Sequence, residues 1–189
     1  MTAADEKQSE TSAAKHGFKK VSQMKLAVVN KIKEFCAGGG FLFAMCSATD
    51  TYDIALAAEG VDICDYMFDG DPADPQAQQK LDYSKSLAFR DFSLIQNPYQ
   101  YEYSNIDATE TRTVPMDLDY FTLFDFSAKW DPVPTMLTQC HTRTVKGFMG
   151  QSTSYVKSVM KPEVLIMGEN KSASETRYIH GILGNGMWT

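Results

Sequence analysis

The sequence has 189 residues, of which 43% are hydrophobic, and this is enough for one sizeable core in a single domain. Its net charge of −6 argues against a nucleic-acid partner, because a polyanion is bound by clustered Lys and Arg. No apolar run approaches the roughly 20 residues that span a bilayer, and residues 1–16 contain no apolar segment of a signal peptide. The composition therefore predicts a cytoplasmic protein with no nucleic-acid or membrane partner. We expect its partner to be a small-molecule substrate.

The cysteines and acidic residues indicate neither a disulfide scaffold nor a metal centre. The four cysteines are sparse for such a scaffold, and none forms the CxxC pair of a structural zinc site. An acidic run over residues 65–74 lacks the D-x-D-x-D-G spacing and the closing Glu of a calcium loop, so a solvated loop is the preferred interpretation. We therefore expect no metal and no cofactor.

The first half of the chain has the pattern of a helix followed by a buried strand. Residues 1–16 are polar and predict a frayed tail, which leaves 17–189 as a single α/β domain. From Phe18, apolar residues recur at spacings of three and four, which predicts a helix that ends at the glycines 38–40. The apolar run FLFAMC (41–46) is typical of a strand buried on both faces in a parallel sheet.

The rest of the chain completes an α/β pattern. A polar loop follows the first strand and leads into a short helix over 52–58. Two glycines at 184–186 flank an Asn in a hairpin signal. We expect a flavodoxin-like fold, with a mostly parallel sheet flanked by helices and an antiparallel C-terminal hairpin. The remaining predicted strands cover residues 87–89, 99–103, 120–126, 135–139 and 164–168.

Cys46 stands where the first strand gives way to the polar loop. In open α/β sheets, ligands bind at the carboxyl ends of the strands, where this loop would lie. A nucleophile elbow places a Ser or Cys on such a strand-to-helix turn among small neighbours, and here the neighbours are Ala44 and Ala48. The alternative is a buried core thiol, because reduced Cys is among the most buried residue types.

Other polar residues are candidates for ligand binding or for the catalytic base. Ser47, Thr49, Asp50 and Asp53 are candidate ligand-binding residues, although an Asp in this position also serves as a helix cap. His180, in the hairpin strand, and His141, after the predicted strand 135–139, are candidate bases for the thiol. The alternative for each histidine is a packing role.

The stretch GGGFLFAMCSATDTYD, residues 38–53, resembles the central motif of the class I glutamine amidotransferase-like superfamily, near its trehalose-utilisation (ThuA-like) branch. The glycines, Phe41, Ala48, Asp50 and Thr51 match that branch. Cys46 occupies the position of the branch's His, which is the catalytic Cys in the amidotransferases. The later stretches FTLFDFSAKWDPVPTMLTQCH, KGFMGQ and SETRYIHGILGNGMWT are similar to bacterial proteins labelled asparagine synthetase B.

The resemblance implies an amidotransferase-like or hydrolase-like domain in which Cys46 attacks an amide or related acyl carbon. The alternative that it implies is a non-catalytic binding module for a carbohydrate or small ligand on the same scaffold. The family's His and Glu after the last core strand would lie beyond Thr189, and upstream strands would precede residue 1. We therefore expect a missing companion segment, or a homo-oligomer formed through exposed sheet edges.

Overall fold

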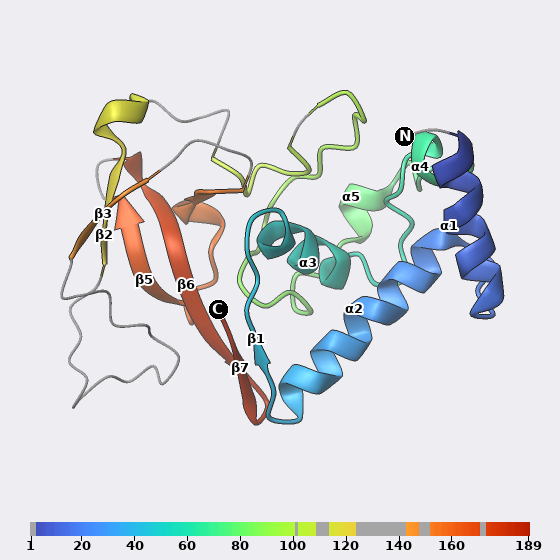
Figure 1. The fold of residues 1–189 in the computed structure, drawn as a ribbon, viewed down its shortest axis with the longest axis horizontal. Coiled ribbons are helices and arrows are strands. Elements are labelled where there is room, and N and C mark those ends of the chain that lie inside the picture. The colour runs from blue at the N-terminus through green and yellow to red at the C-terminus, as the bar shows by residue number, and fades with distance from the viewer. Residues whose placement is uncertain (1–2, 101, 109–113, 124–142, 148–151, 171–172) are drawn as a thin grey trace.

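The computed structural model describes residues 3–100, 102–108, 114–123, 143–147, 152–170 and 173–189 (Figure 1). The helices are α1 (Ala3–Lys15), α2 (Val21–Ala37), α3 (Ala48–Ala57), α4 (Tyr66–Asp69) and α5 (Ala77–Lys80), with short 3-10 turns η1 (Met116–Leu118) and η2 (Lys157–Val159). The strands are β1 (Phe41–Leu42), β2 (Tyr120–Leu123), β3 (Thr144–Lys146), β4 (Tyr155–Val156), β5 (Leu165–Asn170), β6 (Glu175–Leu183) and β7 (Gly186–Trp188). Among the described residues, no helix has both the length and the apolar character needed to cross a membrane.

The strands form one sheet in the order β1-β7-β6-β5-β2-β3, with β4 also paired to β6. This confirms an α/β protein. The sheet is mostly antiparallel, however, in contrast to the expected mostly parallel, flavodoxin-like sheet. The one parallel pair that the described strands form is β1 with β7, in the register Phe41 to Met187 and Leu42 to Trp188. The short connections β5–β6 and β6–β7 explain the difference, because parallel neighbours need a crossover of a dozen or more residues.

The antiparallel C-terminal hairpin is confirmed, with Leu183 of β6 opposite Gly186 of β7. Gly184 has a φ of +60°, and an added Cβ there would lie 2.6 Å from the Ala37 carbonyl oxygen. The turn therefore needs a glycine both for its backbone conformation and for its close approach to α2. The Asn185 N–H also donates to that carbonyl at 2.9 Å, which fixes the hairpin to the C-terminal end of α2.

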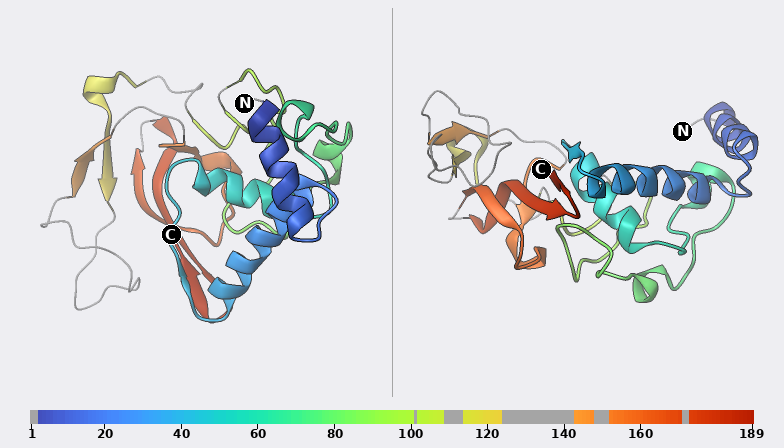
Figure 2. Two further views of the ribbon diagram at one scale, coloured as in Figure 1. Left: turned by 45° about the vertical axis from the view of Figure 1, so that its right-hand side comes forward. Right: turned by 90° about the horizontal axis from the view of Figure 1, so that it is seen from below.

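Three expectations for the N-terminal half need correction. The predicted frayed tail forms the helix α1, which packs against α2 and α4 and buries Ala13 (Figure 2). The apolar stripe of α2 is only partly covered, because Val21 is buried while Val28 and Phe35 are 56% and 63% exposed. The strand predicted to be buried on both faces is a two-residue edge strand, β1, whose Phe41 and neighbouring Phe43 stack outward on the surface. Because β1 is paired only with β7, its other edge has no neighbouring strand whose side chains could cover Phe41 and Phe43.

The core lies between α3, the 86–108 segment and the β6–β7 hairpin. α3 contributes Ile54 and Ala57 from one face. The remaining members come from α2, from the segments 88–106 and 155–164, and from β6 and β7: Cys36, Ala88, Phe89, Phe92, Ile106, Tyr155, Val159, Met160, Val164, Ile179 and Trp188. This packing fixes α3, and with it the turn that joins β1 to α3 (Figure 1).

Candidate functional site

Cys46 lies in the turn between β1 and α3, and it is exposed rather than buried. Its φ is +57°, in the left-handed region that residues other than glycine rarely adopt. The turn is held on both sides of the cysteine. Upstream, the Ala44 N–H donates to the Thr189 carbonyl at 2.8 Å, and downstream the Thr49 N–H donates to the Cys46 carbonyl at 3.1 Å. A strand, a strained residue and a helix in this order are the local architecture of a nucleophile elbow.

Ser47 and Thr49 support the turn through the backbone. Ser47 is the N-cap residue of α3, and its carbonyl accepts the Thr51 N–H at 3.1 Å. Its side chain makes no capping hydrogen bond. The Thr49 hydroxyl donates to the Ala44 carbonyl at 3.3 Å, which bridges the turn from the helix side to the strand side. The structure therefore gives Thr49, predicted to bind ligand, a role in holding Cys46 in place.

Asp50 lies in the first turn of α3 and is fully buried. The sequence offered it as the helix cap, but the N-cap residue is Ser47, three positions earlier. Its Oδ1 accepts the Ser152 hydroxyl at 3.1 Å and the Thr51 N–H at 2.9 Å. Burial raises the pKa of Asp50 to about 6, and the nearby Asp107 carboxylate contributes to the rise. Asp50 is therefore a buried carboxyl group with a raised pKa, just below the Cys46 turn.

Asp53 is buried one turn further along α3. Its carboxylate accepts the backbone N–H groups of Leu87, Ala88 and Phe89 at 2.6, 2.6 and 2.7 Å. Burial raises the pKa of Asp53 to about 6, while these three donors act in the opposite direction. The carboxylate therefore fastens the 87–89 segment to α3, instead of facing a ligand as the sequence predicted.

His180, the predicted base, is buried on β6, with its Nδ1 3.1 Å from the Thr189 hydroxyl oxygen. β7 lies between β6 and β1, so His180 is two strands away from the strand that leads to Cys46. Thr189 connects the two, because its carbonyl holds Ala44 and its side chain meets His180. His141, the other predicted base, lies outside the described residues.

Sequence reasoning missed three polar residues that pack beneath the turn. The Tyr155 hydroxyl donates to the Ser152 carbonyl at 2.8 Å, and the Ser152 N–H donates to Asp107 Oδ2 at 2.6 Å. Burial raises the pKa of Tyr155, a hydrogen bond with Thr49 acts in the opposite direction, and the nearby Asp50 and Asp107 carboxylates add to the rise. Positions 107, 152 and 155 share no motif with residues 46–53, so no local signal could have found them.

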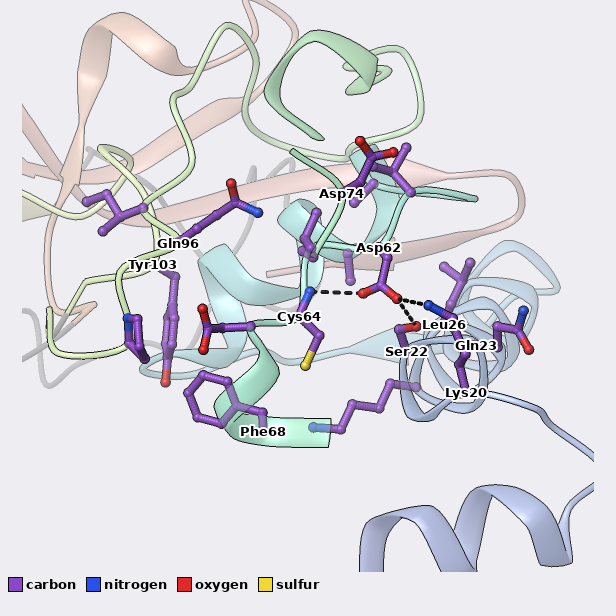
Figure 3. Close-up of a pocket in the computed structure, with 18 of the residues that line it drawn as sticks. Lys20, Ser22, Gln23, Leu26, Asp62, Cys64, Phe68, Asp74, Gln96 and Tyr103 are labelled. Carbon is purple, nitrogen blue, oxygen red and sulfur yellow. Dashed lines mark hydrogen bonds and ion pairs between the residues drawn. The ribbon is translucent and has the colours of Figure 1, made fainter. Parts of the chain in front are cut away.

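A second feature is a cavity of about 770 Å³ between α2 and the segments 58–65 and 95–103 (Figure 3). Phe68 and Tyr103 line it on one side, while Lys20 and Asp62 lie toward α2 (Figure 3). Its volume is in the range of small-molecule sites. The described residues that line it do not include Cys46 or the other residues predicted from its loop.

The Cys46 turn and this cavity are thus two separate features. The turn offers an exposed thiol at the carboxyl ends of the parallel pair β1 and β7, where α/β sheets bind ligands. Comparison of the chain with protein-family models, with curated proteins and with solved structures finds no match.

Proposed function

We propose that this protein is an amidotransferase-like or hydrolase-like enzyme in which the Cys46 thiol attacks the acyl carbon of an amide or a related substrate. The observation that carries the proposal is the exposed thiol on a backbone with a φ of +57°, between β1 and α3. Such strain costs about 1–3 kcal/mol and persists where the surrounding structure fixes it, often at functional sites. The resemblance of residues 38–53 to the amidotransferase-like motif supports the same chemistry.

In the proposed reaction, a histidine takes the thiol proton and Cys46 Sγ forms a bond to the acyl carbon, so that the carbonyl oxygen becomes an oxyanion. Backbone N–H groups at the start of α3, with Ser47 first, would stabilise that charge together with the helix dipole. The tetrahedral intermediate then breaks its C–N bond, and the leaving amine takes the proton from the histidine. Water hydrolyses the resulting thioester, which releases the acid and restores the thiol.

The base in this proposal is His180 or His141. His180 lies at the level of Thr189, whose carbonyl holds the strand side of the Cys46 turn. Substitution of each histidine by Gln separates them, because the base variant loses turnover at pH 7 while the thiol still reacts with alkylating agents. A packing histidine would change both properties only through stability.

Alkylation tests the nucleophile directly. Folded protein at pH 7 is treated with iodoacetamide, and modification of each cysteine is followed by peptide mass spectrometry. We expect Cys46 to react faster in the folded protein than in urea-unfolded protein. Cys36 and Cys64 are internal controls, because burial raises the pKa of both thiols, that of Cys64 to about 12. Protection of Cys46 until unfolding would contradict the proposal.

Turnover is tested with glutamine and with simple amide and thioester substrates. We expect hydrolysis that Cys46→Ala abolishes and that the matched variant Cys64→Ala leaves intact. Cys46→Ala keeps the backbone and the turn contacts, which involve main-chain groups of this residue. Equal activity in both variants would exclude Cys46 as the nucleophile.

A binding module is the second candidate, and the 770 Å³ cavity is the observation in its favour. A protein of this kind would bind a carbohydrate or other small ligand without turnover. Alkylation of Cys46 would leave its affinity for that ligand unchanged. Thermal-shift measurements with mono- and disaccharides on alkylated and untreated protein distinguish the two functions.

A further inference from the structure

Three carboxylates from around α4 gather beside the large cavity. Asp62 precedes the helix, Asp69 is its last residue, and Asp71 follows Gly70, whose φ of +76° turns the chain back. One oxygen of each carboxylate lies within 4.8 Å of the others. Like charges at this separation repel one another, so an ionised cluster of this kind needs a cation.

Asp69 is the member that points to a bound ligand. It is 4% exposed, and neither of its carboxylate oxygens has a hydrogen-bond partner with good geometry among the described residues. The Cys64 thiol and the Asp71 amide lie close to it. A buried carboxylate is normally hydrogen-bonded, paired with a cation or coordinated to a metal. The oxygens of Asp69 therefore mark a place where a positive ligand would be favourable.

The balance of charge around the cluster is acidic. Lys20 bridges two of the three carboxylates, with its Nζ 3.1 Å from Asp62 Oδ2 and in contact with Asp71. Two more carboxylates approach from α1, because a Cβ on Gly70 would lie 2.6 Å from Glu6 Oε1 and 3.5 Å from Glu10 Oε1. Lys20 is the ammonium that bridges the cluster, and Lys25 lines the same cavity and acts on the neighbouring Cys64 thiol.

We propose that Asp62, Asp69 and Asp71 bind a divalent cation of the calcium or magnesium class, which replaces the Lys20 ammonium between Asp62 and Asp71. Carboxylate oxygens are the ligands that these hard cations prefer. A divalent ion would bring two positive charges to the cluster that the Lys20 ammonium now bridges, and it would give Asp69 a positively charged partner. The acidic run at 65–74, expected to be a solvated loop, would then be part of a site completed by a residue outside it.

Isothermal titration of the full chain with CaCl₂, MgCl₂ and MnCl₂ tests the site. We expect saturable binding of at least one of these ions. Asp69→Asn is expected to weaken binding at least tenfold, because it removes a charged ligand and keeps the side-chain shape. Lys20→Met is expected to tighten binding severalfold, because it removes the competing ammonium and keeps the apolar stem. The matched control is Asp74→Asn, in the same loop but paired with Lys80, which should leave the affinity within twofold.

Several outcomes would overturn the site: no saturable binding up to about 10 mM of any of the three ions, equal weakening by Asp69→Asn and Asp74→Asn, or weaker binding by Lys20→Met. The last variant alters a partly exposed side chain, so it remains informative if Asp69→Asn fails to fold. Circular dichroism of each variant verifies folding before titration.

Discussion

The Ala44 N–H donates a 2.8 Å hydrogen bond to the Thr189 carbonyl, which joins the end of the β7 segment to the chain two residues before Cys46. The bond continues the parallel pairing of β1 with β7, since the Thr189 N–H also donates to the Leu42 carbonyl at 2.9 Å. The conformation of Cys46 is therefore fixed by the C-terminal hairpin on one side and by α3 on the other.

The backbone strain at Cys46 predicts an unusual order of stability among its variants. At an ordinary position, Gly is less stable than Ala by roughly 0.5–1 kcal/mol, because it loses more chain entropy on folding. At a φ of +57°, Gly avoids a steric cost that Ala retains. We expect Cys46→Gly to be more stable than Cys46→Ala by about 1 kcal/mol in urea denaturation.

The matched pair is Cys64→Gly and Cys64→Ala, at a cysteine outside the left-handed region. Here the usual order should hold, with the Gly variant less stable. If the Gly variant is less stable than the Ala variant at Cys46 as well, the Cys46 turn is not strained.

Asp50 predicts a pH dependence of stability that an isosteric amide removes. Its pKa is raised from 3.8 to about 6 in the folded protein. A carboxyl with a raised folded pKa contributes most stability below its unfolded pKa, and that contribution is lost as the pH rises through the folded pKa. Relative to Asp50→Asn, the unmodified protein should lose about 1–3 kcal/mol of unfolding free energy between pH 4 and pH 7.

The measurement is urea denaturation of both proteins at pH 4, 5, 6 and 7. Only the difference between them is used, because surface carboxylates such as Asp74 and Asp82 have lowered pKa values and act in the opposite direction. A constant difference across the four pH values would mean that Asp50 is not a titrating group in this range.

The local features of the β1–α3 region could be predicted from sequence, because they depend on short-range chemistry. The glycines at 38–40 end α2 as expected, and the polar residues after Cys46 begin a helix. Gly184 and Gly186 predict the hairpin for two reasons. Gly184 supplies the positive φ of the turn, and Gly186 leaves room for the Cys36 carbonyl oxygen, which a Cβ there would overlap.

The direction of the sheet could not be predicted in this way. The apolar run at 41–46 is compatible with a central or an edge strand, and only its pairing with β7 distinguishes them. That pairing joins residues more than 140 positions apart, such as Leu42 and Trp188. The exposure of β1, with Phe41 exposed and Leu42 half-buried, thus depends on a partner strand far away in the sequence.

The same limit applies to the roles of the site residues. Asp53 reads as a candidate ligand because it is polar and close to Cys46, yet its partners are backbone groups more than thirty residues away. Asp50 likewise meets Ser152, a residue with no motif of its own. Tertiary packing, rather than local spacing, decides whether a carboxylate faces a ligand or holds a loop.

The three backbone donors to Asp53 predict a large loss of stability for Asp53→Asn. The amide has one acceptor oxygen and no charge, and its NH₂ group would face at least one buried N–H donor. We expect a loss of about 2–4 kcal/mol in the free energy of unfolding at pH 7. The control is Asp91→Asn, whose side chain is largely exposed and whose backbone conformation Asn tolerates, with an expected change within about 0.5 kcal/mol. Similar losses in both variants would show that the Asp53 contacts contribute little.

The buried ion cluster of Arg177, Asp119 and Glu175 predicts that Arg177→Met loses much more stability than Lys157→Met. Arg177 Nη2 lies 2.6 Å from Asp119 Oδ1 and 3.4 Å from Glu175 Oε2, and the arginine side chain is 3% exposed. Arg177→Met would leave two buried carboxylates without this cation, at an expected cost of about 3–5 kcal/mol. The Lys157–Glu169 pair has a similar separation of 2.7 Å, but the lysine side chain is 45% exposed.

Lys157→Met should therefore cost no more than about 1 kcal/mol, because water solvates both charges when the pair is broken. Urea denaturation of the two variants at pH 7 compares them. The two ion pairs differ chiefly in exposure. If the stabilities of the two variants lie within about 1 kcal/mol of each other, burial does not increase the contribution of the Arg177 cluster to stability. A large loss confined to Arg177→Met would instead identify this cluster as a link between β6 and the start of β2, across the intervening strand β5, since Asp119 immediately precedes β2 and the other two residues lie on β6.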